Sequence, residues 1–430
     1  MYMAPLIRLI KKTYTMAHPR ERAVVMQNAA SLSLLQIITY ILPVILIPYL
    51  FRVLGPEKFG LIAFAQAFVQ YFMIVTDYGF SITATKEISL CRNEHAKVSK
   101  AFSSVMIVKI SLACISFLLL CVIVYCIPKF RNDWLVYILS FGAVIGNTLF
   151  PIWFFQGTEK MKYITVLNSA GGVILTFLIL LCVKGPGDYL MVPLITSSVL
   201  LITGFSGLYI VFKKFRVSFK FQKYKNIRQQ LKAGWDIFIS VAAINAYTST
   251  RIFILGLLTN NSITGFYSIA EKIANACQTF PLNSFSQALF PRLSSMFQKN
   301  KNRAFQITMR IQQITTILSL IFIPLIFIFS DIIIKAVCGG TYTEAVLSLR
   351  ILLISVFFVT SNAFRVQFLL ICGKTDIYSR IHVIMAIIGL PLIFLLIDSF
   401  SYAGAAAATA LIEAGIFTIT FFTVKKFSFS

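Results

Sequence analysis

The sequence is poor in charged residues, and above all in acidic ones. Only 13% of its 430 residues are charged and 58% are hydrophobic, and 15 Asp and Glu stand against 39 Lys and Arg. A soluble domain carries about 25% charged residues. The composition therefore excludes an ordinary soluble domain and predicts that most of the chain lies in lipid.

Residues that bind metals or form disulfides are also few. There are three histidines, His18, His95 and His382, and they are far apart in the sequence. None of the eight cysteines forms a Cys-x-x-Cys pair, and most lie within apolar stretches. Buried cysteines of this kind behave as small apolar residues. We therefore predict neither a metal site nor a disulfide framework.

Signatures of nucleotide-dependent enzymes are missing as well. Residues 373–375 (GKT) imitate the end of a P-loop, but Phe368 occupies the position of its first glycine. The chain has no Asp-x-Asp pair of the kind that holds a metal in many sugar-nucleotide transferases, and no loop between apolar stretches exceeds about twenty residues. The sequence predicts no nucleotide, no cofactor and no active site outside the membrane.

The chain consists instead of about a dozen apolar stretches, each long enough to cross a bilayer, which takes roughly 20 residues. Backbone groups in lipid must satisfy one another, so the expected element is the helix. The ten-residue alternation of a membrane β-barrel is absent. We predict an all-α integral membrane protein with about 12 transmembrane helices. The predicted spans are 24–50, 60–85, 102–128, 134–156, 163–183, 189–212, 233–258, 263–290, 306–330, 345–371, 377–397 and 403–424.

The positions of the basic residues predict the orientation. Most Lys and Arg lie before the first span, after the last, or in alternate connections, and the richest segment is 213–232. The opposite side holds Arg52, Lys58, Lys129, Arg131, Lys184 and Lys335. Such asymmetry is the positive-inside pattern, which puts both termini in the cytoplasm. Segment 213–232 is expected to contact anionic lipid head groups rather than nucleic acid.

The two halves of the sequence resemble each other. Residues 60–66 (GLIAFAQ) match 265–271 (GFYSIAE), and residues 100–102 (KAF) match 303–305 (RAF), at nearly the same offset. Because each half has six spans, the lobes face the same way and are related by a pseudo-two-fold axis along the membrane normal, with a cleft between them. The predicted parts are a cytoplasmic segment 1–23, an N-lobe 24–212, a basic linker 213–232, a C-lobe 233–424 and a tail 425–430.

Polar residues follow one face of two matching spans. They are Gln66, Gln70 and Asp77 in the second span and Glu271, Asn275 and Gln278 in the eighth. Polar groups are costly against lipid, so these stripes are expected to line a wet cavity. Hydrogen bonding that merely holds helices together is the alternative.

Charged residues within the spans need a partner, water or a substrate, because a lone charge costs at least about 2.5 kcal/mol. The bases are Lys109, Arg251, Lys272, Arg310, Arg350 and Arg365, and the acids are Asp77, Glu271 and Glu413. We expect Lys109 and Arg310 to extend toward the membrane surface. The excess of bases favours an anionic substrate, since guanidinium matches phosphate oxygens.

These observations yield two groups of candidate site residues. The candidates for substrate binding are Arg52, Arg251, Lys272, Arg350, Arg365, Gln66, Gln70, Asn275 and Gln278. The candidates for binding a coupling ion are Asp77, Glu271 and Glu413, although structural pairing with Arg or Lys is an equal alternative. Arg52, at the outer end of the first span, is either an interfacial anchor or part of a gate.

The first third of the chain resembles the bacterial O-antigen flippases (Wzx type). The resemblance lies in residues 46–61 (LIPYLFRVLGPEKFGL), 63–68 (AFAQAF), 77–80 (DYGF) and 153–157 (WFFQG). These flippases belong to the polysaccharide transporter family of the multidrug/oligosaccharidyl-lipid/polysaccharide exporter superfamily.

The resemblance implies two six-helix lobes around a central cavity that opens alternately to either side. It implies a transporter in the bacterial inner membrane that moves undecaprenyl-diphosphate-linked O-antigen units from the cytoplasmic to the periplasmic leaflet, with cavity arginines on the diphosphate. An O-antigen polymerase and a chain-length regulator are candidate partners. The alternatives are a multidrug or cation antiporter of the same superfamily, which predicts an acidic cavity, and a membrane polymerase or glycosyltransferase.

Overall fold

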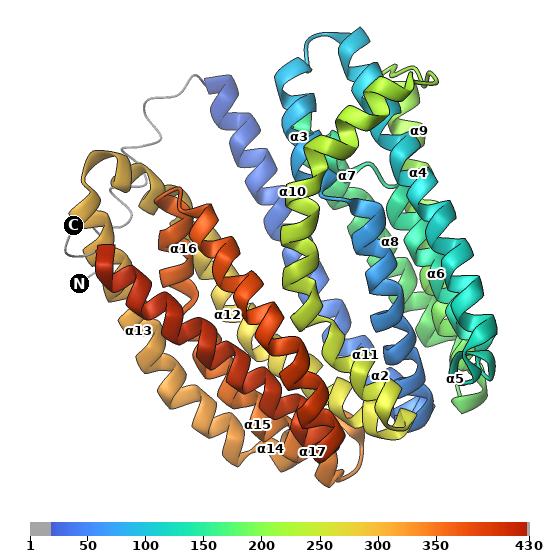
Figure 1. Cartoon of the computed structure of the whole chain (residues 1–430), viewed down its shortest axis with the longest axis vertical. Coiled ribbons are helices and arrows are strands. Elements are labelled where there is room, and N and C mark those ends of the chain that lie inside the picture. Colours follow the sequence, from blue (N-terminus) through green and yellow to red (C-terminus); the bar gives the residue numbers. More distant parts are fainter. Residues whose placement is uncertain (1–18, 428–430) are drawn as a thin grey trace.

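The protein is described here by a computed structural model that covers residues 19–427. Side chains are described from residue 41 onward, apart from 246–248, 279–292, 294, 295, 299 and 427. Within residues 19–427 every regular element is a helix, as the sequence predicts. Figure 1 shows the helices gathered into two bundles, one from each half of the chain.

Both bundles contain long helices joined by short connections. The first half forms α2 (Pro19–Asp77), α3 (Phe80–Cys91), α4 (His95–Cys126), α5 (Pro128–Arg131), α6 (Trp134–Leu149), α7 (Ile152–Gly157), α8 (Met161–Cys182), η1 (Pro186–Leu190) and α9 (Met191–Lys214). The second half forms α10 (Tyr224–Thr248), α11 (Thr250–Leu258), α12 (Asn261–Lys299), α13 (Lys301–Ile328), α14 (Ser330–Cys338), α15 (Thr343–Thr360), α16 (Ala363–Ile371) and α17 (Thr375–Phe427). The predicted linker 213–232 is only partly irregular: residues 215–223 lie outside the helices, and α10 begins within the linker, at Tyr224.

The helices follow the predicted spans in order along the chain. Eight helices in the described part of the chain are long and apolar enough to span a membrane, and the bent pair of α10 and α11, at 51°, would make a ninth. Two of the eight, α2 and α17, each cover two predicted spans, and between those spans the backbone leaves the helical conformation at Gly55 (φ 72°) and Ser401 (φ 53°). The long helix α12 covers the predicted span 263–290.

The fourth crossing of each half is broken at a corresponding place. In the first half α6 and α7 are separated at Phe150 and Pro151, where proline cannot continue a helix. In the second half α15 and α16 are separated at Ser361 and Asn362. This recurrence agrees with the repeat seen in the sequence.

The two lobes touch most closely where α2 crosses α12. A Cβ atom on Gly60 would lie 1.8 Å from the backbone oxygen of Asn261, and one on Gly265 would lie 2.1 Å from that of Pro56. Only glycine allows two helix backbones to approach so closely. Gly60 and Gly265 are equivalent positions of the repeat, so the pseudo-two-fold axis passes near their contact.

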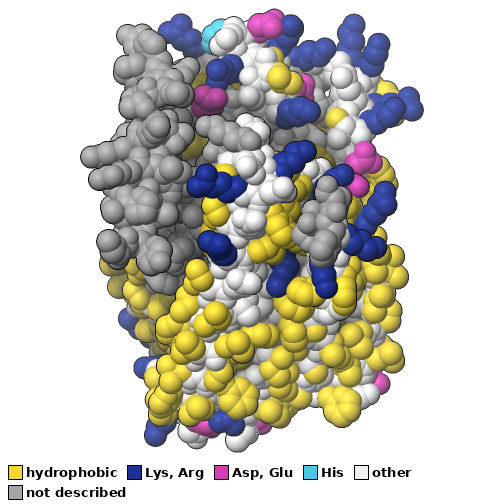
Figure 2. All heavy atoms as spheres, turned by 90° about the vertical axis from the view of Figure 1, so that its left-hand side faces the viewer, with side chains coloured by type: hydrophobic (Ala, Val, Ile, Leu, Met, Phe, Trp, Pro, Cys, Tyr) yellow, Lys and Arg dark blue, Asp and Glu magenta, His cyan; other side chains and the backbone are white. Residues whose placement is uncertain are grey.

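The molecule has two chemically different ends. Lys and Arg gather at the upper end in Figure 2, above a broad apolar band. We call this the basic end; it includes the C-terminus of α9 and the N-terminus of α10, at the top of Figure 1. The far end includes α5, α11 and α14, at the bottom of that view. A buried apolar core continues from one lobe into the other, from Phe51 and Leu54 to Leu255 and Leu349.

At the basic end the first helix of the second half also packs against the first lobe. The ring of Phe238 on α10 stacks on Tyr78 with centroids 4.9 Å apart. A Cβ atom on Gly79 would lie 2.7 Å from Ile237. The first helix of the predicted lobe 233–424 thus contacts the first lobe as well as its own.

Candidate functional site

A cavity lies between α2 and the second lobe. Its volume is about 610 Å³. The first lobe contributes only α2, and α11, α12, α15, α16 and α17 provide the rest of the wall. The polar side chains of the lining are Gln66, Gln70, Ser249, Arg251, Ser268, Glu271, Lys272, Asn275, Gln278, Ser355, Asn362, His382, Thr409 and Glu413. The wall of the cavity is thus largely polar, although the helices around it are apolar.

Both predicted polar stripes face this cavity, with one exception. Gln66 and Gln70 reach it from α2, and Asn275 and Gln278 reach it from α12. Together with Asn362, five primary amides, each a donor and an acceptor, therefore share one chamber. An amide-rich wall suits a ligand with many hydroxyl groups, because each amide can pair with a donor or with an acceptor.

An ion pair lies in the cavity wall. Arg251, in the first turn of α11, approaches the Glu271 carboxylate of α12 at 3.0 Å, and both side chains are 11% exposed. The hydroxyl of the fully buried Tyr267 donates to the same carboxylate at 3.4 Å. Removing one member of a buried pair leaves an uncompensated charge, which is strongly destabilising. Arg251 and Glu271 therefore depend on each other.

Acidic and basic side chains are equal in number in the cavity wall. The excess of bases that the sequence shows within the spans is therefore not found in the cavity. Its acidic members are Glu271 and Glu413, and its basic members are Arg251 and Lys272. His382 from α17 adds a fifth titratable group, and its Nδ1 lies 2.8 Å from the backbone oxygen of Tyr378. Counting charges along the sequence failed because most of the bases within the spans lie elsewhere.

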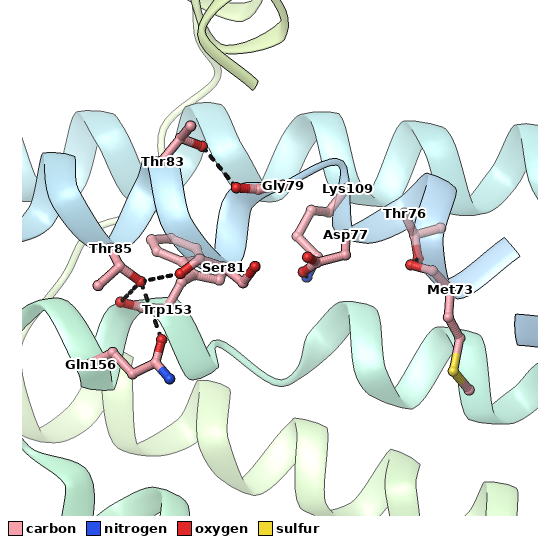
Figure 3. A network of polar contacts seen from close by, with 10 residues as sticks. All are labelled: Met73, Thr76, Asp77, Gly79, Ser81, Thr83, Thr85, Lys109, Trp153 and Gln156. Atoms are coloured by element: carbon pink, nitrogen blue, oxygen red, sulfur yellow. Dashed lines mark hydrogen bonds and ion pairs between the residues drawn. The ribbon is translucent and has the colours of Figure 1, made fainter. Parts of the chain in front are cut away.

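Asp77 is the exception among the stripe residues, because it does not line the cavity. Figure 3 shows Lys109 of α4 directed toward Asp77 at the end of α2, and the two charged atoms are 3.7 Å apart. The Lys109 side chain is 1% exposed. The expectation that Lys109 extends to the membrane surface is therefore wrong, since burial beside a carboxylate offers the ammonium a partner. Asp77 is placed as the partner of Lys109 rather than in the cavity.

Three other predicted binding residues also lie outside the lining. Arg52 contacts backbone oxygens of α14 at the far end. Arg350 pairs with Asp331 and lies over the ring of Phe327 at 5.4 Å. Arg365 lies over the rings of Phe417 and Phe421, 5.1 Å from each centroid. These arginines have protein partners, and their side chains do not reach the cavity.

Sequence reasoning also missed several lining residues. Ser268 and Asn362 are 0% and 4% exposed, and neither Ser268 Oγ nor Asn362 Oδ1 has a hydrogen-bond partner in the described structure. Asn362 lies at the break between α15 and α16, which no pattern in the sequence marks. His382 is the eighth residue of α17. It is far in sequence from the two polar stripes, so the pattern of the stripes does not predict its place in the cavity. Among the described residues no group of His, Cys, Asp and Glu could hold a metal ion.

Comparison with known proteins identifies the family. The family model described as "Polysaccharide biosynthesis protein" matches residues 25–297. The chain belongs to this family. A relative in Escherichia coli (strain K12), named "Putative O-antigen transporter", is 32% identical over 93% of this chain and 96% of its own length.

Two solved transporter structures share the fold of this chain. The lipid II flippase MurJ in an inward closed conformation has a TM-score of 0.72 at 12% identity, over 93% of this chain and 87% of that one. An inward-facing multidrug transporter of the MATE family has a TM-score of 0.70 at 10% identity, over 90% and 95%. The predicted two-lobe helical fold is confirmed.

Proposed function

We propose that this protein is a flippase that moves undecaprenyl-diphosphate-linked O-antigen units from the cytoplasmic to the periplasmic leaflet of the bacterial inner membrane. The observation that carries the proposal is the amide-rich chamber between two lobes of a polysaccharide biosynthesis protein. A sugar chain and a diphosphate cannot cross hydrocarbon unaided, because their polar groups would lose their hydrogen bonds to water. The polyprenyl tail can remain in lipid while the head passes through the cavity.

Each group of lining residues has a proposed role. Gln66, Gln70, Asn275 and Gln278 would pair with sugar hydroxyls, and Lys272 and Arg251 would meet the diphosphate. Glu271 and Glu413 are the proposed sites for a coupling ion. The basic end would face the cytoplasm, as the positive-inside pattern expects. The chamber is small beside a full oligosaccharide, so the lobes would have to part further around a bound unit.

The decisive experiment is deletion of the gene in its host. Lipid-linked O-antigen units should accumulate on the inner leaflet, and a plasmid copy should restore the lipopolysaccharide ladder. Lys272→Gln should fail to restore it, whereas Lys225→Gln, which changes an exposed lysine of α10, should succeed. A normal ladder from Lys272→Gln would remove this residue from the proposal, and a normal ladder after deletion would refute the function.

Arg251 needs a separate test, because its pairing with Glu271 is itself important. Arg251→Ala should abolish the ladder, and Arg251→Lys should recover part of it if charge is what matters. The double variant Arg251→Ala/Glu271→Ala tests whether pairing is the whole role of Arg251. Renewed transport would mean that Arg251 only balances Glu271 and would remove both residues from the proposal, whereas continued loss would agree with a transport role for at least one of them.

The relatives named above bear on the alternatives. The curated relative is named as a transporter, which argues against a polymerase or glycosyltransferase. The balanced cavity does not by itself exclude a lipophilic cation, since two carboxylates line it. Comparison of drug susceptibility between the deletion strain and its parent separates an antiporter from a flippase: a changed susceptibility with a normal ladder would favour the antiporter.

A further inference from the structure

An arginine of the first lobe contacts the second lobe at the far end. Arg52, exposed near the Gly55 kink of α2, donates from Nε to the backbone oxygen of Val337 at 2.9 Å. Its Nη2 donates to the backbone oxygen of Ala336. Both acceptors lie in the last turn of α14, and Gly339, with φ 79°, follows the helix. The arginine thus caps a helix of the other lobe.

A lysine of the first lobe makes the same kind of contact at a second place. Lys129 lies in α5 and donates from Nζ to the backbone oxygens of Leu257 and Thr259, at 2.9 and 2.8 Å. These oxygens belong to the C-terminal end of α11. Both contacts therefore join a cation of the first lobe to the C-terminus of a helix in the second.

Helix C-termini are suited to hold a cation. The last four carbonyl oxygens of a helix have no partner within it, and the helix dipole places partial negative charge there. A side-chain ammonium or guanidinium satisfies these oxygens and is attracted by the dipole. The contact needs no acidic residue, which fits a chain that has few of them.

The two contacts occupy equivalent places in the repeat. Arg52 lies at the end of the first crossing, in α2, and contacts α14, which follows the ninth crossing, α13. Lys129 follows the third crossing, α4, and contacts α11, which ends the seventh crossing. Exchanging the lobes interchanges the first crossing with the seventh and the third with the ninth. The contacts therefore lie about the same pseudo-two-fold axis as the contact between Gly60 and Gly265.

Aromatic packing surrounds both contacts. Phe51, beside Arg52, packs against Tyr342 of the second lobe with ring centroids 5.7 Å apart. Phe64 stacks on Phe253 at 5.5 Å, and Lys129 Nζ lies 5.8 Å from the Phe64 centroid. Burial lowers the pKa of Lys129 from its ordinary value. Partial exclusion of water strengthens a hydrogen bond between charge and carbonyl.

We propose that Arg52 and Lys129 form a gate that holds the far end of the cavity closed and releases it when the lobes part. Hydrogen bonds of 2.8–2.9 Å cannot survive a separation of the lobes by several ångström. Cation and carbonyls are rehydrated when they part, so the gate is reversible. Loss of either contact is expected to shift the ratio of closed to open molecules by about three- to tenfold, and loss of both by the product.

The test measures access to the cavity from the far end. Ala67→Cys places a thiol in the cavity wall, and an impermeant maleimide added to intact cells reports openings toward the periplasm. The double variant Arg52→Gln/Lys129→Gln should label at least tenfold faster than the parent, after subtraction of labelling on the eight native cysteines. In inverted vesicles the same thiol should label more slowly than in the parent.

Arg131→Gln is the matched control. Arg131 is also a far-end cation that caps a helix, but its Nε and Nη2 donate to the Tyr125 oxygen of its own lobe, at 3.0 and 2.6 Å. Equal labelling of the double variant and this control in both preparations would overturn the gate. The proposal depends on the proposed function only for which side is periplasmic; a reversed orientation would exchange the two preparations and leave the difference intact.

A cross-link tests the same idea without relying on the double variant. Lys129→Cys with Thr259→Cys places two thiols across the contact, for a reducible bis-methanethiosulfonate reagent. The cross-linked protein should neither restore the lipopolysaccharide ladder nor open its cavity at the far end. Cleavage of the cross-link by a reductant should recover both activities. Lys129→Cys alone should not respond to the reagent. A cross-linked protein that still opens at the far end would refute the gate.

Discussion

The break between α15 and α16 depends on one side chain from another helix. Gln312 of α13 is 1% exposed; its Nε2 donates to the Thr360 oxygen at 3.1 Å, and its Oε1 accepts from the Phe364 N–H at 2.9 Å. A helix broken inside a membrane must find such partners, because no water is available to its free backbone groups. We therefore predict that Gln312→Leu destabilises the protein.

The magnitude follows from the two groups left unpaired. An unsatisfied buried backbone group costs about 1–3 kcal/mol in proteins, although hydrogen bonds between membrane helices average only about 0.6 kcal/mol. Leucine conserves most of the volume, so a cavity adds little. A loss of about 2–4 kcal/mol is expected, which corresponds to a fall of about 2–4 °C in Tm for a chain of this size.

The assay is thermal unfolding of the purified protein in detergent, with Gln313→Leu as the control. Gln313 is the next residue on α13 and is exposed, so its replacement should leave Tm nearly unchanged. Transport should also fall in Gln312→Leu, because Asn362 at the break lines the cavity. Equal Tm values for the two variants would refute the reasoning.

Two further outcomes are expected from the packing. Gly265→Ala should reduce folded protein severely, because the new Cβ would lie 2.1 Å from the Pro56 oxygen, while Gly187→Ala, with nothing within 4 Å, should be neutral in the same yield measurement. Asp77→Asn should cost about 2–4 kcal/mol by leaving the buried Lys109 ammonium unpaired. The double variant Asp77→Asn/Lys109→Met should recover most of that loss, and strictly additive losses in a double-mutant cycle would show that the two residues do not interact.

The cavity could be predicted from the sequence only in part. Gln66, Gln70, Asn275 and Gln278 were found because a helical period places them on one face of each helix, and lipid disfavours that face. Their common cavity follows from the repeat, which brings equivalent helices together. Asp77 lies on the same helical face but at the end of α2, where the chain breaks before Gly79 and Lys109 of α4 is adjacent.

The sequence does not predict which charged residues within the crossings reach the cavity. Arg251 and Arg350 are both arginines within crossings of the second lobe, yet one lines the cavity and the other pairs with Asp331 away from it. Which of these occurs depends on the rotation and depth of each helix relative to its neighbours. Those quantities are decided by side-chain packing between helices and leave no local signal.

The sequence by itself determined that most of this protein lies in lipid, that its structure is helical, and that Lys and Arg gather at one end. These follow from local properties: the length of an apolar run, the need of a backbone in lipid to satisfy itself, and the distribution of Lys and Arg. The tertiary structure alone decided which charges meet, which of them reach the cavity, and that Arg52 and Lys129 cap helices of the opposite lobe. These contacts join residues on different helices, and the two capping contacts join residues more than a hundred positions apart, so only the packed arrangement of the helices can specify them.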